Sequence, residues 1–193
     1  AAVPVWGGDA CGPVGAGVDG PVRAMGVTDG GTLVVAGAFA NAGGGPAIRV
    51  ARWNGAAWST VGAGLPDVPD AIAANDAGEV VAVVQGQLWR FDGGTWGTIA
   101  AAGAVTAVGS APGGDFVVAG TFAVPGGVTG CARLSAGALT PLTIPAIAVR
   151  TLGRDAFGAV LAASPSFSGQ VFRLQGSAFT QLGLLPIPFA FVD

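Results

Sequence analysis

The sequence repeats itself, and this self-similarity constrains the fold more than any single motif does. In four segments an arginine precedes a large apolar residue, and a second large apolar residue follows five positions later: 52–58, 90–96, 133–139 and 173–179. The arginines are separated by 38, 43 and 40 residues. Residues 6–15 form a fifth, partial copy, because they align with 53–62 without a gap. A period of about 40 residues indicates one supersecondary unit that stacks on its neighbours.

The second half of each repeat is a predicted β-hairpin. Three copies carry a dipeptide suited to two-residue type I′ turns, in which both central residues need a positive φ: Asn54-Gly55, Asp92-Gly93 and Gly7-Gly8. On such a hairpin Trp53 and Trp58 are diagonal neighbours on one sheet face, and Phe91 with Trp96 repeats that arrangement.

The first half of each repeat is a second predicted hairpin. Its two strands are expected at 22–27 and 33–39, 71–74 and 79–84, 105–108 and 116–122, and 148–152 and 159–163. Aspartates recur in or beside the turns, and their spacing favours turn chemistry over a calcium loop: Asp29, Asp76, Asp115 and Asp155. Four strands per repeat, apolar on both faces, predict an all-β fold of propeller blades, with a β-solenoid as the alternative.

The repeat pattern resembles a known group of proteins. The elements Gly-x-Leu-Val-Val-x-Gly-x-Phe, a Gly-Gly loop and Val-Ala-Arg-Trp-x-Gly-x-x-Trp are similar to propeller repeats of unknown function in large exported bacterial proteins, and more distantly to kelch blades. The match is best over 22–65 and fair over 105–142. The resemblance implies a propeller fold and an extracellular setting, and it supplies no catalytic residue.

We expect a single β-propeller domain over 1–193, with about five four-stranded blades. It divides into a half-blade (1–18), four repeats (19–66, 67–102, 103–145 and 146–185) and a terminal strand (186–193). Joining the two ends within one molecule closes the ring with a blade split between the N- and C-termini. Joining them between molecules instead produces rings or filaments of several chains.

Composition excludes several classes of function. The chain contains no His or Tyr, and its eight basic residues are all Arg, against eleven acidic residues and a net charge of −3. So few bases predict no nucleic-acid binding, and the missing His and Lys remove the imidazole base, the His metal ligand and Schiff-base chemistry. The uncharged stretches are interrupted by Gly, Pro and polar residues, so we expect no membrane insertion. We therefore expect no enzyme activity, no metal and no cofactor.

Candidate binding residues come from the repeated aromatic and basic positions and from one long loop. Tryptophans could stack on sugar rings and arginines could line a binding surface, although both are also suited to packing between blades. The loop over 40–49 is long, as is 123–130, whereas 85–87 and 168–170 are short. The candidates are Trp53, Trp58, Trp96, Arg52, Arg90, Asn41 and Arg49.

Cys11 and Cys131 are the only cysteines. An even number in an exported chain suggests one disulfide, but the two lie in blades that are not adjacent in a five-bladed ring. An intermolecular bridge and two free thiols stay open, and a Cys nucleophile is not expected without His.

The sequence thus favours a non-enzymatic structural or interaction module of the cell exterior, which can self-assemble through its split blade. Its expected partners are further copies of itself or another extracellular protein. The small residues Ala-Ala-Val-Pro at the start agree with an exported, mature chain. The alternative is a lectin-like propeller that binds glycans.

Overall fold

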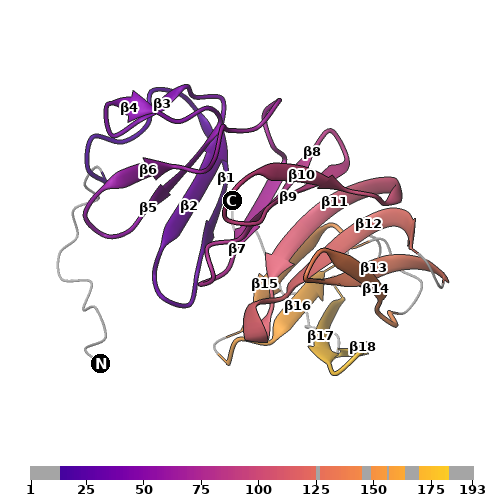
Figure 1. The fold of residues 1–193 in the computed structure, drawn as a ribbon. Coiled ribbons are helices and arrows are strands. Elements are labelled where there is room, and N and C mark those ends of the chain that lie inside the picture. The colour runs from indigo at the N-terminus through magenta and orange to yellow at the C-terminus, as the bar shows by residue number, and fades with distance from the viewer. Residues whose placement is uncertain (1–13, 125–126, 145–148, 156, 164–169, 183–193) are drawn as a thin grey trace, which may run out of the picture.

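The computed structural model describes residues 14–124, 127–144, 149–155, 157–163 and 170–182. Within these ranges four antiparallel four-stranded sheets follow one another along the chain, as Figure 1 shows. Blade 1 comprises β1 (Val22–Val27), β2 (Leu33–Gly37), β5 (Val50–Trp53) and β6 (Trp58–Thr60). Blade 2 comprises β7 (Ala71–Ala74), β8 (Val80–Val84), β9 (Gln87–Phe91) and β10 (Trp96–Ile99).

Blade 3 contains the longest strands: β11 (Ala102–Ser110), β12 (Phe116–Val124), β13 (Gly127–Ser135) and β14 (Ala138–Pro141). Blade 4 consists of β15 (Thr151–Arg154), β16 (Val160–Ala163), β17 (Val171–Gln175) and β18 (Ala178–Gln181). A short 3-10 turn, η1 (Pro112–Gly114), joins β11 to β12. The all-β prediction and the four strands per repeat are confirmed. The half-blade strands before residue 14 and the terminal strand 186–193 lie outside the described residues.

The turn between the first two strands has the same form in all four blades. Its first residue donates its backbone N–H to the carbonyl four positions later, in the pairs Thr28–Thr32, Asn75–Glu79, Ala111–Asp115 and Asp155–Ala159. This shared hydrogen bond aligns the blades residue by residue.

The predicted two-residue turns at Asn54-Gly55 and Asp92-Gly93 are wrong. Trp53 pairs directly with Trp58, so residues 54–57 form a four-residue loop. The Oδ1 atom of Asn54 accepts hydrogen bonds from the N–H groups of Ala56 and Ala57 at 3.0 and 2.9 Å. The Asn54 side chain thus forms an Asx turn, and its backbone does not adopt the positive φ that a type I′ turn requires. Asp92 forms the same kind of turn in blade 2. Gly7-Gly8 lies outside the described residues.

The core lies between the blades, because both faces of each sheet are apolar. All five residues of β8 are buried. Val80 and Ala82 pack in a cluster with Val34 of blade 1, whereas Val81 and Val83 face blade 3 and pack in a second cluster. A third cluster joins blades 3 and 4 through residues such as Val117, Cys131, Val160 and Phe172.

The long loop of the first repeat forms a small hairpin of β3 (Asn41–Ala42) and β4 (Gly45–Pro46). It covers the outer face of blade 1 together with an arm, residues 14–19, that bridges to it through Val18 and Ala42. The second repeat has the expected short connection, in which Gln85 and Gly86 have φ values of 51° and 75°. Residues 164–169 of the fourth repeat lie outside the described residues.

Glycine 62 occupies a position that a side chain cannot share. Its φ is +57°, and a Cβ atom there would lie 2.8 Å from the Phe91 ring. We expect Gly62→Ala to lower the free energy of unfolding by about 2 kcal/mol, through backbone strain and overpacking. Urea unfolding measures this change. Gly97→Ala is the control, because a Cβ at Gly97 meets no atom within 4 Å, and an equal loss in both variants would contradict the packing argument.

Candidate functional site

The four first turns are connected to one another by polar contacts. From blade 2, Asp76 Oδ1 accepts a hydrogen bond from Gly30 N in blade 1 at 2.8 Å, and Asn75 Nδ2 donates to Gly114 O in blade 3 at 2.6 Å. From blade 4, Arg154 forms an ion pair with Asp29 of blade 1 at 2.5 Å. Asp29 and Arg154 are 125 residues apart in sequence, and their ion pair links the first and last described blades.

These turns lie at one end of a pocket between the blades, and we call this end of the molecule the turn face. The pocket has a volume of about 430 Å³ and is lined by the first strand of every described blade: β1 (through Met25 and Val27 among others), β7, β11 and β15. Its wall is mostly small and apolar, with Asp70 and Arg150 at the end opposite the turns and Arg154 at the turn end. A second space of about 350 Å³ lies at the turn face between Asp29, Asp76, Ser110 and Arg154. The arrangement can hold a ligand.

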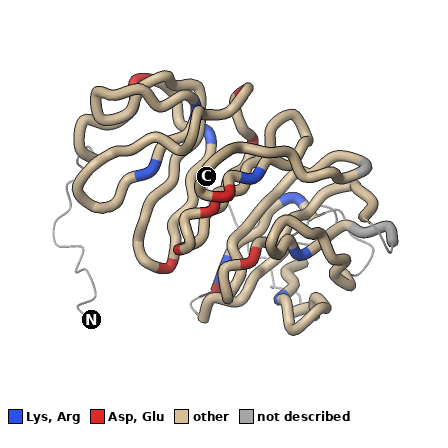
Figure 2. The backbone as a smooth tube through the Cα atoms, in the orientation of Figure 1, with Lys and Arg blue, Asp and Glu red and all other residues tan. Residues whose placement is uncertain are grey.

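Most charged residues of the blades lie at the turn face, and Figure 2 marks their positions along the backbone in red and blue. The four ion pairs among the described residues all lie there: Arg90–Glu79, Arg133–Asp115, Arg154–Asp29 and Arg173–Asp155. Hydrogen bonds lower the pKa of Asp76, chiefly from the Thr28 hydroxyl and then from Gly30 N. Asp76 is therefore held as an anion by neighbouring donors.

The tryptophans predicted as binding residues hold the chain segment that comes just before their blade, an arrangement that we call a clasp. The Trp53 and Trp58 rings lie 5.5 Å apart, and Trp58 Nε1 donates to Val14 O at 2.8 Å. Gly15 lies against the same pair, since a Cβ there would approach Trp53 to 2.8 Å.

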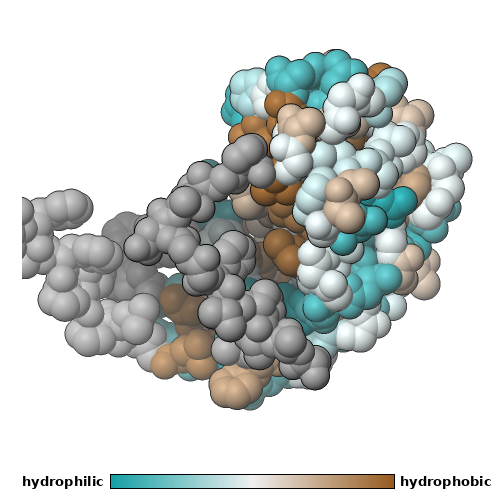
Figure 3. All heavy atoms as spheres, turned by 90° about the vertical axis from the view of Figure 1, so that its left-hand side faces the viewer, coloured by the Kyte–Doolittle hydropathy of each residue, from teal (hydrophilic) through white to brown (hydrophobic). Residues whose placement is uncertain are grey.

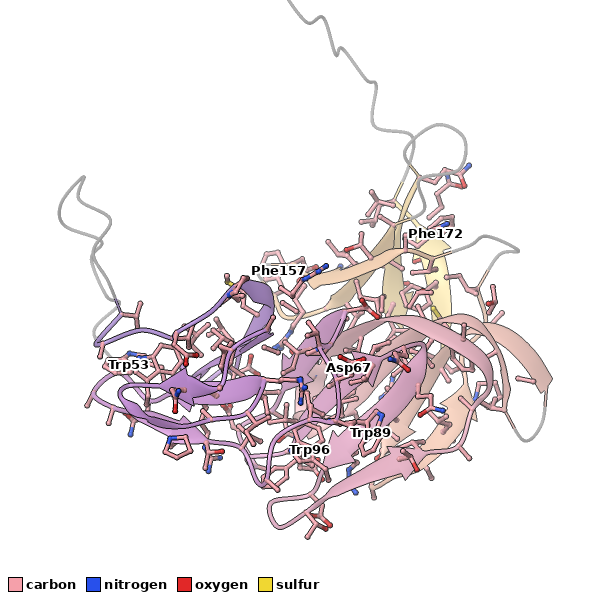
Figure 4. The ribbon with its side chains drawn as sticks, turned by 90° about the horizontal axis from the view of Figure 1, so that it is seen from above. Trp53, Asp67, Trp89, Trp96, Phe157 and Phe172 are labelled. Atoms are coloured by element: carbon pink, nitrogen blue, oxygen red, sulfur yellow. The ribbon has the colours of Figure 1, made fainter. Side chains whose placement is uncertain are left out.

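Blade 2 repeats this clasp. The Phe91 and Trp96 rings are 5.6 Å apart, Trp96 Nε1 donates to Val61 O at 2.9 Å, and Gly62 lies against them. Figure 4 shows Trp53 and Trp96 on separate blades. The indole N–H of Trp58 and that of Trp96 are thus both engaged by backbone carbonyls.

The remaining predicted site residues lie apart from one another. Asn41 is in the β3–β4 hairpin and binds the arm, because its N–H and side-chain amide donate to the two carboxylate oxygens of Asp19 at 2.9 and 2.7 Å. Arg49 Nη1 donates to Leu65 O at 2.9 Å. Arg90 pairs with Glu79. Arg52 faces a cleft between blades 1 and 2, and Arg90 lines the next cleft, between blades 2 and 3.

Cys131 is fully buried between blades 3 and 4. Burial raises the pKa of its thiol to about 12, which disfavours a thiolate nucleophile at neutral pH. Its predicted partner Cys11 lies outside the described residues. Across the described part of the chain, no group of three or more His, Cys, Asp or Glu side chains is placed to hold a metal ion. None of the described helical segments is long and apolar enough to cross a membrane.

The contacts between turns of different blades were not predicted from the sequence. Asp29 and Asp76 were assigned to local turns, but each bonds to another blade, and Arg154 and Asn75 were not singled out at all. The recurrence of polar residues at the first position of the turn was the available signal.

The indole hydrogen bond of the blade 2 clasp can be tested by substitution. We expect Trp96→Phe to lower the free energy of unfolding by about 1 kcal/mol more than Trp89→Phe does. Of these two residues, Trp96 alone donates an indole hydrogen bond to a backbone carbonyl of the described residues. Urea unfolding with fluorescence detection measures both. Equal losses would mean that ring volume alone matters.

The arm anchor predicts a pH dependence. Hydrogen bonds from Asn41, followed by Ala40, lower the pKa of Asp19 from its ordinary value of 3.8. The folded state therefore favours the ionised form, so this contribution is complete above the unfolded-state pKa and is lost as the pH falls below it. We expect Asp19→Asn to reduce the loss of the urea midpoint between about pH 6 and about pH 3.

The matched control is Asp70→Asn, since the Asp70 carboxylate makes no hydrogen bond to the described residues. If Asp70→Asn reduces the pH dependence as much as Asp19→Asn does, the arm anchor is not its source.

Comparison with known proteins gives the fold. No protein-family model and no curated protein sequence matches the chain. Virginiamycin B lyase from Staphylococcus aureus is structurally similar, with a TM-score of 0.57 and 14% identity over 86% of this chain. A catalytically inactive form of that lyase with quinupristin gives 0.53 at the same identity and coverage. YCF48 bound to D1 peptide gives 0.45, with 15% identity over 82% of the chain.

The chain spans little more than half of these proteins, 56% of the lyase and 51% of YCF48. At such low identity the likeness establishes architecture alone. The chain has a β-propeller fold.

Proposed function

We propose that this chain is a non-enzymatic structural and interaction module of the cell exterior, and that it associates with further copies of itself through its terminal blades. The observation that carries this proposal is a row of apolar side chains on β1 that are exposed, whereas the residues at the same positions of the other first strands are buried or partly buried. The extracellular setting rests on the resemblance to exported repeat proteins.

The alignment of the turns identifies the uncovered position. Three residues before the turn, the first strand carries Ile72 in blade 2, Val108 in blade 3 and Leu152 in blade 4. Ile72 is 6% exposed and Val108 7%, and each belongs to the cluster shared with the preceding blade, against which Leu152 also packs in blade 4. The equivalent residue of blade 1 is Met25, which is 67% exposed.

The neighbours of Met25 on β1 are also exposed. Val27 is 57% exposed, whereas its blade 2 equivalent Ala74 is 3% exposed. Val22 adds a third exposed apolar side chain on the same strand. Figure 3 shows the side of the molecule on which blade 1 lies, with hydrophobic residues in brown and hydrophilic residues in teal. A row of exposed apolar side chains such as that of β1 supports association with an apolar partner surface.

Blade 4 presents the complementary kind of surface. Leu161, Ala163 and Val171 occupy the positions that Val34, Ala36 and Val50 occupy in blade 1. The blade 1 residues are buried against blade 2, but those of blade 4 are only partly buried. The hairpin and the arm already cover the outer face of β2 and β5, so contact between the blade 4 face of one copy and the blade 1 row of another would repeat only the first-strand part of the internal blade interface. Because this contact is head-to-tail, it produces closed rings or filaments.

Light scattering across a range of protein concentrations, with electron microscopy of the same samples, tests this proposal. We expect species heavier than one chain of 18.6 kDa. Met25→Glu should weaken the association at least about tenfold, because burying a methionine contributes about 1.5–3 kcal/mol. Ile48→Glu is the control, since Ile48 is exposed but lies in the loop before β5.

A single-chain mass at every concentration would overturn self-association, and so would equal weakening by the two variants. Met25 is the only methionine, so its rate of peroxide oxidation reports directly whether the row is covered. Protection that increases with protein concentration supports a second copy as the cover. Protection that does not change with concentration contradicts it.

The lectin-like alternative gains nothing from the tryptophans. Sugar stacking requires an open ring face, and the Trp58 and Trp96 pairs hold neighbouring glycines and carbonyls instead.

A further inference from the structure

One arginine of the repeated set differs from the other three. The third strand of each blade carries an arginine at the same register position: Arg52, Arg90, Arg133 and Arg173. Arg90, Arg133 and Arg173 each form an ion pair with a carboxylate of their own blade. Arg52 forms no ion pair within the described part of the chain, where its guanidinium makes one hydrogen bond, from Nε to Ser59 Oγ at 3.3 Å.

The reason lies in the turn that precedes the second strand. The residue just before this strand is Glu79 in blade 2 and Asp115 in blade 3, and each pairs with the arginine of its blade. In blade 4 the partner is Asp155, the first residue of the turn, where blade 1 has Thr28. The residue just before the second strand of blade 1 is Thr32, whose hydroxyl cannot neutralise a cation. The terminal nitrogens of the Arg52 fork are therefore available to an external acceptor.

Arg52 faces a cleft of about 360 Å³ between blades 1 and 2, on the turn face. Hydroxyl and amide groups surround the guanidinium, from Thr32, Asn54 and Ser59. The two carboxylates of the lining have their own donors: Glu79 accepts from Arg90 and Asn75, and Asp76 accepts from Gly30 N. The volume suits a ligand of about the size of one sugar ring.

The next cleft along the ring provides an internal comparison. It lies between blades 2 and 3, has a volume of about 310 Å³, and is lined by Arg90, Glu79 and Asp115. Its arginine is paired with Glu79, so the same architecture there presents a neutralised guanidinium. The difference between the clefts is the residue before the second strand.

We propose that the cleft at Arg52 is a binding site for a small hydroxylated carboxylate, such as a sugar acid. The guanidinium fork would hold the carboxylate through paired N–H donors, as arginine does in protein ion pairs. The Thr32 and Ser59 hydroxyls and the Asn54 amide lie where they can bond to ligand hydroxyls. This site is independent of self-association, because it lies between blades 1 and 2 and not on the exposed row of β1.

Titration with glucuronate, followed by NMR of the arginine Nε–H groups, tests the proposal. We expect saturable shifts at the Arg52 signal and none at the ion-paired Arg133 signal. Glucose is the matched neutral probe and should produce no saturable shift, because it has the hydroxyls without the carboxylate. Equal responses to glucose and glucuronate, shifts shared by all arginines, or no shift at Arg52 would overturn the proposal.

Variants make the test specific to the cleft. Arg52→Gln should weaken glucuronate binding by roughly tenfold or more, which is the loss expected for a charge-assisted hydrogen bond. The control Arg133→Gln removes an equivalent arginine of blade 3 and should leave the affinity unchanged. A similar loss in both variants would place the ligand elsewhere.

The sharpest variant restores the missing partner. Thr32→Glu gives Arg52 the carboxylate that Arg90 has in blade 2, so we expect a folded protein in which glucuronate binding falls at least tenfold. Thr98→Glu adds the same charge on the exposed surface of β10 and should retain binding. Circular dichroism establishes that each variant folds. Retained binding in folded Thr32→Glu would overturn the role of the unpaired arginine.

Discussion

The structure depends on sheets that are apolar on both faces. A sheet with one apolar face needs one partner, but a strand such as β8, buried along its whole length, needs a neighbour on each side. Alternating residues of β8 then belong to two different clusters, one shared with blade 1 and one with blade 3. No blade can bury its core alone, so the blades must stack around a common axis. The low content of charge, 10% of residues, follows from the same requirement.

Stacking also determines where polar chemistry can occur. The buried faces of the strands offer no space for ions, so most charged residues of the blades lie at the turn ends of the strands (Figure 2). There the contacts extend from one blade to the next, as Asn75 to Gly114 and Arg154 to Asp29 do. The turn face therefore carries the polar contacts between blades, and it is also the surface best suited to bind a polar ligand.

The sequence predicted the repeats, the first hairpins and the placing of each aromatic pair on one sheet face, because these depend on local periodicity and turn formers. The aromatic residues are direct cross-strand partners, however, and not the diagonal neighbours that were expected. The sequence also failed at Asn54, where the same residue type supports either a left-handed backbone or an Asx turn, and the structure uses the second. It could not predict that Trp58 holds Val14 or that Arg154 pairs with Asp29, because those contacts require the relative placement of separate blades. The unpaired state of Arg52 became visible only once the register placed Thr32 where Glu79 and Asp115 stand.

Two features set blade 1 apart from the other blades: the exposed apolar row of β1 and the arginine without an ion pair, Arg52. They lie on opposite sides of β1. Gly26 of β1 faces blade 2, where a Cβ would lie 3.5 Å from Ala73, whereas Met25 and Val27 are exposed on the other side. The covered side of β1 faces blade 2, and the Arg52 cleft lies on this side of blade 1. The exposed side is the row proposed for association. Among the described blades, blade 1 has one neighbour instead of two, so its outer residues need no fit to a preceding blade. The same relaxation does not apply to Arg52, which lies at an internal interface, and its unpaired charge there needs a different explanation from edge exposure. A ligand that supplies the missing carboxylate is such an explanation.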